Sequence, residues 1–429
     1  RAAFNRLFDE TMSSLRFNVD GENEPLPLEP TLNLMTDTDG AKRKAGAQAI
    51  ATTLGENLRL FTLITNTLAK DKEIEDRWRG FSDVADSRHL ANRVEREVVD
   101  ALVTSVTGSF ERISHRYYAL KAKWLGLEKL QAWDRNAPLP QAPDSQIGWR
   151  EAQDIVLEAY SGFSPKMADV ASRFFDNGWI DAPSRPGKAP GAFAHPTVPS
   201  AHPYVLLNYL GKPRDVMVLA HELGHGVHQV MAAEQGALMA STPLTLAETA
   251  SVFGEMLTFQ SLLAKTTDKA SRKAMLAQKA EDMINTVVRQ IAFYNFERKV
   301  HEARRGGELT TQDINAHWLS VQGESLGEAV ALNEGYETFW CYIPHFIHSP
   351  FYVYAYAFGD CLVNSLYAVY QNAETGFQDA YFDMLRAGGS KHHSELLAPF
   401  GLDASDPGFW NKGLAVIEGI IDELEQMEN

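Results

Sequence analysis

Cysteine is scarce in this sequence, which holds only Cys341 and Cys361 among its 429 residues. A disulfide framework of the kind that staples small secreted domains needs more cysteines, so we expect a reducing compartment. Long apolar runs are also missing: no stretch of about eighteen or more residues predicts a membrane-spanning helix, and no signal peptide is visible. The sequence therefore predicts a cytoplasmic protein whose two thiols pack as small hydrophobic groups.

Positively charged residues are also few compared with acidic ones. Lysine and arginine number 40 against 56 aspartates and glutamates, which gives a formal net charge of −16. Nucleic acids and anionic membrane surfaces both select basic patches, so this balance excludes them as the main partners. The rest of the composition, with 45% hydrophobic and 22% charged residues, is that of an ordinary globular protein whose acidity favours solubility.

Helical periodicity dominates what is present. Apolar side chains recur at helical spacing along most of the chain, with proline-rich connections between them, so we expect a mainly α protein. A chain of 429 residues exceeds the usual size of one hydrophobic core. We therefore expect a helical lobe over residues 1–180 and a catalytic region over residues 181–429.

The residue composition changes near residue 181, where the catalytic region is expected to begin. Residues 182–203 are rich in proline and contain glycines, which favours loops and edge strands over helix. Residues 204–210, YVLLNYL, then predict a short strand. An exposed edge there would pair with the backbone of an extended peptide, which makes Tyr204 a candidate substrate contact.

The next stretch carries the pattern H-E-x-x-H at His221, Glu222 and His225. On a helix, residues four apart lie on one face about 5–6 Å apart at Cβ, so both imidazoles can reach one metal ion at about 2.0–2.1 Å. Glu222 lies beside that face, where its carboxylate can take a proton from an attacking water. The pattern also arises by chance in long helices, so a third ligand is needed to identify a metal site.

A zinc peptidase requires a third protein ligand and an open position for water. One known arrangement places a third histidine six residues after the second, but that position is Met231. The helical stretch over residues 244–263 offers Glu248 and Glu255 on one face. Glu248 lies among small and apolar residues, where a metal ion would relieve the cost of an unpaired carboxylate. This favours Glu248, although spacing alone leaves both open.

Together these motifs resemble the M3 family of zinc metallopeptidases, in its oligoendopeptidase F branch. The resemblance rests on HELGHGVH at residues 221–228 and ETASVFGE at residues 248–255. Further stretches extend it over nearly the whole chain: GKAPGAF (187–193), HPYVLLNY (202–209), RQIAFYNFE (289–297), PHF (344–346) and FYVYAYAFG (351–359). It implies a multi-helical zincin-type fold with a small β-sheet beside the active-site helix and a deep substrate cleft. Family members usually begin with a further helical segment, which this sequence is expected to lack.

The resemblance also implies roles for individual residues. His221, His225 and Glu248 would hold one Zn²⁺ ion, and Glu222 would act as the general base. Glu255 would accept a hydrogen bond from a ligand histidine, although a surface or core-paired glutamate explains it equally well.

The family places a histidine and tyrosines after the metal motifs, for substrate binding and oxyanion stabilisation. This suggests His345 and Tyr356 as catalytic groups, with Tyr352 and Tyr354 as substrate contacts. On a helix Tyr352 and Tyr356 share a face while Tyr354 points elsewhere, and simple packing is the alternative for all three. His348 is a weaker candidate for the imidazole role.

Three other features are weaker. Gly191 lies in a loop whose glycines would allow close backbone approach to a substrate, unless the loop is a plain connection. His228 is expected to be structural. His392 and His393 are expected to lie in a loop, because adjacent side chains on a helix point apart and do not suit one metal ion.

The function expected from these residues is hydrolysis of internal bonds in short peptides by a zinc endopeptidase. A zinc carboxypeptidase of similar helical build is one alternative, and it would need a basic pocket for the terminal carboxylate of its substrate. A non-catalytic peptide-binding protein is the other. Glu222 argues against it, since a structural metal site gains nothing from a base.

Overall fold

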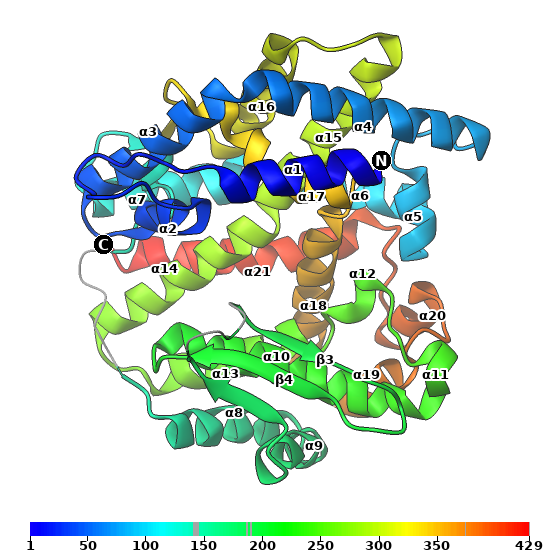
Figure 1. Ribbon diagram of the computed structural model, residues 1–429. Helices are drawn as coiled ribbons and strands as arrows, with labels where there is room; N and C mark the ends of the chain where they lie inside the picture. Colours follow the sequence, from blue (N-terminus) through cyan, green and yellow to red (C-terminus); the bar gives the residue numbers. More distant parts are fainter. Residues whose placement is uncertain (140–145, 186–187, 189–190, 374, 429) are drawn as a thin grey trace.

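The computed structural model describes residues 1–139, 146–185, 188, 191–373 and 375–428, and these are mostly helical (Figure 1). The helices before the larger sheet are α1 (Ala2–Ser14), α2 (Leu28–Asn33), α3 (Gly40–Glu56), α4 (Leu58–Trp78), α5 (Asp86–Asn92), α6 (Arg96–Thr107), α7 (Arg116–Trp124), α8 (Trp149–Phe163) and α9 (Pro165–Asp176). The mainly α fold expected from the sequence is confirmed. None of the described helices is both long and apolar enough to cross a membrane.

The second half of the chain supplies the remaining helices. They are α10 (Pro213–Ala232), α11 (Gly236–Met239), α12 (Leu244–Ala247), α13 (Ser251–Lys265), α14 (Lys269–Thr286), α15 (Val288–Gly306), α16 (Thr311–Leu326), α17 (His345–His348), α18 (Tyr354–Asn372), α19 (Phe377–Arg386), α20 (His393–Leu397) and α21 (Pro407–Gln426). Two short strands, β1 (Leu130–Gln131) and β5 (Val330–Ala331), pair in parallel and join the two halves.

The larger sheet has the strand order β2-β4-β3. Strand β2 (Ile180–Pro183) runs parallel and β3 (Phe193–His195) antiparallel to the central strand β4 (Tyr204–Tyr209). The strand predicted over residues 204–210 is therefore present, but the expectation that it forms an exposed edge is wrong, because β2 and β3 cover both of its sides. Strand β3 is the edge that packs on α10, and it lies within the proline-rich residues 182–203, for which loops and edge strands are expected.

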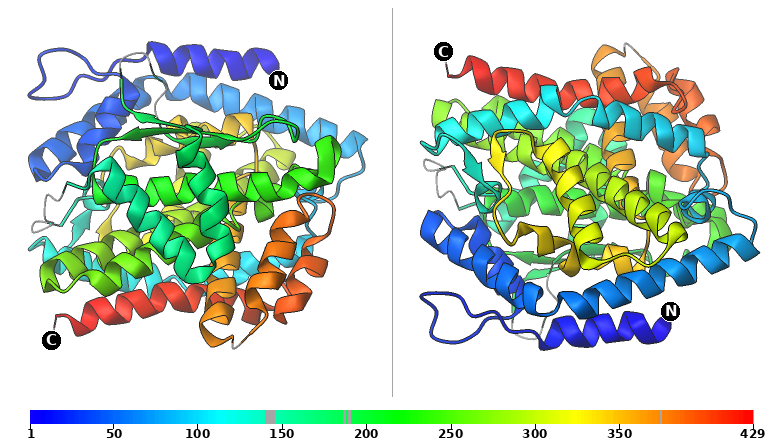
Figure 2. Two further views of the ribbon diagram at one scale, coloured as in Figure 1. Left: turned by 90° about the horizontal axis from the view of Figure 1, so that it is seen from below. Right: turned by 90° about the horizontal axis from the view of Figure 1, so that it is seen from above.

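Two groups of helices pack around α18, which runs between them in Figure 1. In the lower group α10 packs on α13, and the larger sheet packs on α10. The left view of Figure 2 shows α8 and α9, in teal, covering the underside of this group. In the other group α4 and α16 pack on α15, while α6 and α14 pack on α21. Buried apolar side chains form one continuous core through both groups.

These contacts cross the boundary expected near residue 180. Helices α8 and α9 precede it and pack on α13 and α10, whereas α4 and α6 pack on α15 and α21 from the far end of the chain. The division into residues 1–180 and 181–429 stays a prediction. In space, each group draws helices from both regions.

Helix α10 begins with a tight connection from β4 and buries one face. Pro213 occupies its first turn, where the missing N–H costs no hydrogen bond. Asp215 accepts from the backbone N–H groups of Leu210 and Lys212 at 2.8 and 3.0 Å. Buried apolar side chains then recur at helical spacing: Val216, Leu219, Ala220, Leu223 and Val227.

Two glycines allow α10, α13 and α8 to pack closely: Gly224 between α10 and α13, and Gly254 between α13 and α8. A Cβ at Gly224 would lie 2.4 Å from the backbone oxygen of Ala250 and 2.7 Å from Cα of Ser251, at the start of α13. A Cβ at Gly254 on α13 would lie 2.3 Å from the hydroxyl oxygen of Tyr160. Because the neighbours of Gly224 are backbone atoms, no side-chain rotation relieves that clash.

We expect Gly224→Ala to lower the free energy of unfolding by about 1–3 kcal/mol, because the added methyl group forces α10 and α13 apart. Gly419→Ala, at an exposed position of α21 with no atom within 4 Å of the added Cβ, is the matched control. It should be neutral or stabilise the chain by up to about 1 kcal/mol. Denaturant unfolding measures both, and equal stability of the two variants would contradict the close packing at Gly224.

Candidate metal and active site

Helix α10 and the turn between α12 and α13 bring three candidate ligands together. His221 and His225 project from one face of α10, with ring centroids 4.9 Å apart. Glu248 lies in the turn between α12 and α13, so the helix expected over residues 244–263 is interrupted at this residue. Its Oε2 lies 3.4 Å from Nε2 of His221 and 3.4 Å from Nε2 of His225.

These separations suit a tetrahedral metal ion. Donor atoms held at 2.0–2.1 Å from zinc in a tetrahedral site lie about 3.3–3.4 Å from one another. The same distances are long for N–H···O hydrogen bonds, which are typically about 2.7–3.2 Å. The three donor atoms therefore surround a common point. Two imidazole nitrogens with one carboxylate oxygen are a donor set typical of zinc.

Neighbouring groups hold Glu248 in place. The hydroxyl of Ser251 donates to Glu248 Oε2 at 2.7 Å. Helix α18 approaches from another direction, and a Cβ at its Gly359 would lie 2.9 Å from Cβ of Glu248. The sequence reasoning missed both residues. The three-residue spacing of Ser251 from Glu248 was an available local signal, whereas the contact with Gly359 exists only in the folded chain.

Glu255 extends the site through further polar contacts. Nδ1 of His221 lies 3.3 Å from Glu255 Oε2, and Nζ of Lys279 donates to Glu255 Oε1 at 2.7 Å. With Nδ1 facing this carboxylate, Nε2 of His221 is left for a metal ion. Lys279 on α14 is 6% exposed and was not identified from the sequence, because nothing in its spacing distinguishes it from the other lysines of that helix.

The charges of the site favour a bound cation. Burial disfavours the ionised form of Glu248, but its attraction to His225 and His221 outweighs burial and lowers the Glu248 pKa to about 2. Burial acts likewise on Glu255, where Lys279 and His221 lower the pKa to about 2. Burial opposes protonation of His221, yet Glu255 and Glu248 raise its pKa to about 9. Two ionised carboxylates thus surround the imidazoles at neutral pH, and a metal ion would replace the proton of His221.

Glu222 lies on α10 beside the ligand face and is 8% exposed. Burial raises the pKa of its carboxyl group, while the charges of His221 and His225 and a hydrogen bond from the Ala194 backbone N–H act in the opposite direction. A raised pKa suits a group that takes up and returns a proton near neutral pH. Since Ala194 belongs to β3, this contact places the edge strand against the motif helix.

His345, Tyr352 and Tyr356 form a second cluster. The Tyr356 hydroxyl and Nε2 of His345 are 3.2 Å apart, and the Tyr352 ring lies 5.7 Å from the His345 ring and 5.2 Å from the Tyr356 ring. Burial raises the pKa of both tyrosines, and the negative charge of Glu248 adds to the effect. Both phenols therefore keep their protons at neutral pH and can donate hydrogen bonds.

Two candidates from the same stretch lie elsewhere. Tyr354 is fully buried, with its hydroxyl oxygen 3.2 Å from His89 Nδ1 and 2.9 Å from Asn92 Nδ2, so the expectation that it contacts substrate is wrong. Its position two residues from each of the other tyrosines turns it toward the core. His348 lies 2.8 Å from Asp9 on α1 instead of joining the cluster.

Gly191 lies just before β3 and Tyr204 is the first residue of β4, so both belong to the region of the larger sheet. Gly191 precedes β3 with a φ of 80°, and its carbonyl oxygen accepts from Asn208 Nδ2 at 2.9 Å. Gly187 of the same loop lies outside the described residues. Tyr204 opens β4, is 52% exposed and packs on His202 at a ring distance of 4.5 Å. A substrate contact stays a prediction for both Gly191 and Tyr204.

A cavity of about 390 Å³ opens beside His225. Its walls come from residues 196–203 before β4, the second half of α10, and residues 237–247 before Glu248. His228 lines it at 4% exposure, with Nε2 3.3 Å from the Thr242 hydroxyl, and burial lowers the His228 pKa to about 4. The structural role expected for this histidine stays a prediction. The cavity provides room for part of a ligand next to His225.

Comparison with known proteins identifies the family. Residues 33–416 match peptidase family M3. The chain is 26% identical to oligopeptidase PepF of Bacillus subtilis, over 98% of this chain and 62% of PepF. It is 27% identical to group B oligopeptidase PepB of Streptococcus agalactiae, over 96% of this chain and 68% of PepB. An oligoendopeptidase F homolog of Lactococcus lactis is 26% identical over 92% of this chain and 65% of its own length. The chain thus spans about two thirds of the length of these curated relatives.

Solved structures share the fold. A protein of Chlamydophila abortus superposes with a TM-score of 0.89 at 26% identity, over 99% of this chain and 72% of that one. Oligoendopeptidase F of Enterococcus faecium superposes with a TM-score of 0.79 at 23% identity, over 99% of this chain and 71% of that one. The expected multi-helical zincin-type fold is therefore confirmed. By sequence and by fold, the chain belongs to peptidase family M3, in its oligoendopeptidase F branch.

Proposed function

We propose that this chain is a zinc-dependent endopeptidase that hydrolyses internal bonds of short oligopeptides. The observation that carries the proposal is the 3.4 Å spacing of Glu248 Oε2 from Nε2 of both His221 and His225. Glu222, beside these ligands on the same helix, supplies the base that hydrolysis needs. The names of the curated relatives agree with this activity, and the proposal for this shorter chain rests on its own residues.

In this proposal His221, His225 and Glu248 hold one zinc ion. When bound, zinc polarises the scissile carbonyl and lowers the pKa of water to about 7. Glu255 orients His221 through the contact with Nδ1, and Lys279 keeps Glu255 ionised. Three protein ligands suit a catalytic site, since a structural zinc site is usually closed by a fourth.

Glu222 moves the proton. Its carboxylate accepts a proton from the attacking water and returns it to the amine of the leaving product. Burial strengthens it as a base by raising its pKa, and the Ala194 backbone N–H holds the side chain at the edge of β3.

The edge of β3 supports binding of an extended peptide. One side of this strand pairs with β4, and the other faces α10, where the Ala194 carbonyl accepts from Gln229 Nε2 at 3.3 Å. A substrate that adds to this edge would replace the Ala194 contacts with Gln229 and Glu222 by backbone hydrogen bonds that do not depend on its sequence. The cavity beside His225 would take an adjoining part of the peptide.

Tyr356 and His345 stabilise the negative charge that develops on the substrate carbonyl. Their 3.2 Å contact orients the two groups relative to one another, and the raised pKa of Tyr356 keeps its hydroxyl a donor. Such donors act mainly on the transition state and raise turnover more than ground-state binding. Tyr352 packs beside both rings and contacts the substrate in this proposal.

A zinc carboxypeptidase is the nearer alternative. It would need a basic group for the terminal carboxylate, and among the described residues that line the cavity Arg173 is the one arginine or lysine. This single exposed arginine supports C-terminal trimming less well than the edge of β3 supports internal cleavage. A non-catalytic peptide-binding protein is disfavoured by Glu222, because burying a carboxylate without a role in chemistry is costly.

The two cysteines bear on the compartment in which the chain works. We place the chain in the cytoplasm because Cys341 and Cys361 are both free and buried, which fits a reducing compartment.

For the metal ligands, we expect Glu248→Ala to lose the zinc ion of this site, because two histidines alone then remain. Glu255→Gln should keep zinc with an affinity lowered about 10–100-fold, the usual effect of removing an outer partner of a ligand histidine. Elemental analysis after dialysis against graded chelator concentrations measures both. A greater loss of zinc in Glu255→Gln than in Glu248→Ala would exchange their proposed roles.

For the base, Glu222→Gln should keep zinc but hydrolyse peptides at least about 100-fold more slowly, because an amide cannot take the proton. Glu128→Gln, the same change at an exposed position of the other helix group, is the control and should alter neither property. Steady-state hydrolysis of a quenched fluorescent peptide, with zinc content measured on the same samples, tests both. Undiminished turnover by Glu222→Gln would remove the proposed base and the mechanism with it.

For the oxyanion donor, Tyr356→Phe should lower kcat about 100–1000-fold with KM and zinc content little changed. Tyr354→Phe is the matched change two residues away, and it should retain kcat. It should instead lower the free energy of unfolding by about 1–3 kcal/mol, because the buried groups of His89 and Asn92 lose their partner. Steady-state kinetics and denaturant unfolding measure both variants. A loss of kcat in Tyr354→Phe with normal kcat in Tyr356→Phe would contradict the assignment of Tyr356 as the oxyanion donor.

A further inference from the structure

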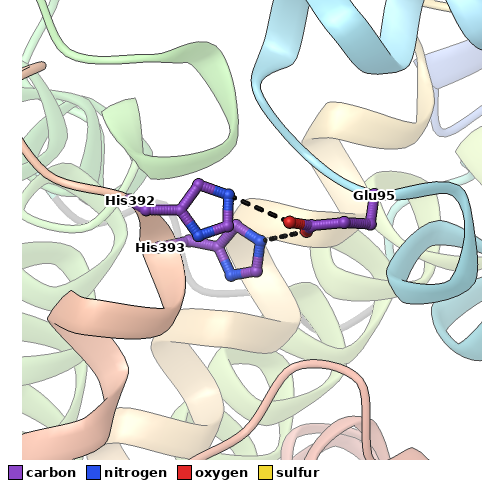
Figure 3. Close-up of side chains that lie close together, drawn as sticks. All are labelled: Glu95, His392 and His393. Atoms are coloured by element: carbon purple, nitrogen blue, oxygen red, sulfur yellow. Dashed lines mark hydrogen bonds and ion pairs between the residues drawn. The ribbon is translucent and has the colours of Figure 1, made fainter.

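Glu95, His392 and His393 converge outside the site described above (Figure 3). Nε2 of His392 lies 3.2 Å from Glu95 Oε1, and Nε2 of His393 lies 2.7 Å from Glu95 Oε2. The two imidazole rings are 4.1 Å apart, and both point at the same carboxylate. Potential ligand atoms of all three residues lie within 4.8 Å of one another.

The backbone explains why two adjacent histidines point the same way. His392 is the residue before α20, with an extended φ of −79° and ψ of 152°, whereas His393 is the first residue of that helix. The expectation that the pair lies in a loop holds for His392 but not for His393, and the objection that adjacent side chains point apart applies only where both residues lie within a helix. Nδ1 of His392 accepts from the Ser394 backbone N–H at 3.5 Å and lies 2.9 Å from the Ser394 hydroxyl, which fixes the ring with its Nε2 directed at Glu95.

We propose that Glu95, His392 and His393 form a second site for a divalent transition metal ion, with zinc as the first candidate. Two imidazole nitrogens and one carboxylate are a donor set that zinc uses throughout proteins, with water completing the coordination. The 3.2 Å contact is already close to the separation of about 3.3–3.4 Å between donors in a tetrahedral zinc site. The shorter contact opens if the Glu95 carboxylate, which is half exposed, rotates slightly.

The exposure of the cluster suits a bound cation. Glu95 is exposed, His392 is partly buried and His393 is buried, so solvent water reaches the cluster from one side and could complete the coordination. Without an ion, the two histidines are hydrogen-bond donors to one carboxylate.

The position of the cluster indicates a structural role. Glu95 is the residue before α6, and nearby Arg93 donates to the carbonyl of Gly389 at 2.5 Å. The N–H of Gly389 donates to the Met239 carbonyl at 2.7 Å, and a Cβ at Gly389 would lie 2.5 Å from the backbone oxygen of Ser241, a residue of the cavity wall. An ion here would therefore tie α6 to the segment that supports the cavity, and it would stabilise the chain without taking part in hydrolysis.

The number of zinc ions bound by four proteins, the parent chain over residues 1–429 and three variants of it, tests the site. We expect two tightly held ions in the parent chain, one in Glu95→Gln, one in Glu248→Ala and none in the double variant. Glu95→Gln is nearly isosteric at a half-exposed position, so it should fold normally, and His392→Ala should give the same count by removing a different ligand. Glu128→Gln is the control and should keep two ions.

Thermal unfolding gives a second readout in the Glu248→Ala background, where the first site is disabled. Added zinc should raise the midpoint there and should fail to do so once Glu95→Gln is included. An ion count that stays the same as the parent chain's in both Glu95→Gln and His392→Ala would overturn the proposal and leave the cluster as a pair of hydrogen bonds. A single ion in the parent chain that Glu95→Gln removes would instead contradict the first site. Because ions are counted rather than turnover, this outcome is independent of whether the chain cleaves peptides.

Discussion

The close approach of α10 and α13 at Gly224 is the contact on which the rest of the site depends. With no Cβ between the helices, the backbone of Ala250 and Ser251 rests directly on α10. The turn just before α13 then presents Glu248 at 3.4 Å from both histidines of the motif. Metal–ligand distances tolerate errors of about 0.2 Å, so a displacement of one helix by a methyl group would disturb the donor set. Packing between backbones is thus as important to the site as the ligands themselves.

The negative charge of the carboxylates around His221 and His225 favours a bound cation at this site. Glu248 and Glu255 are partly buried and both contact His221, and Lys279 offsets only one of the two carboxylates. A cation between His221, His225 and Glu248 would neutralise the carboxylate that Lys279 does not pair with. The metal ion is therefore part of the proposed function. The edge of β3 and the tyrosine cluster approach the same region from other elements, so the proposed site combines ligands, base, peptide-binding edge and oxyanion donors from distant parts of the chain.

Sequence reasoning succeeded where a local pattern carried the information. The helical periodicity, the strand before α10 and the convergence of His221, His225 and Glu248 follow from spacing and from a family resemblance. It failed where long-range pairing decides the outcome: β3 pairs with β4 and takes its place as the edge, and Tyr354 turns into the core. The loop expected for His392 and His393 ends one residue early, because His393 begins α20, and the boundaries of a helix are among the least certain features that a sequence predicts.

The most direct test of the central claim is mass spectrometry of the products formed from a mixed set of short peptides. The digestion is run with the chain as purified, with a chelator, and with zinc restored after chelation. The account expects cleavage at internal bonds that the chelator abolishes and zinc restores. Stepwise loss of C-terminal residues, or intact peptides in the presence of a folded chain that holds zinc, would contradict it.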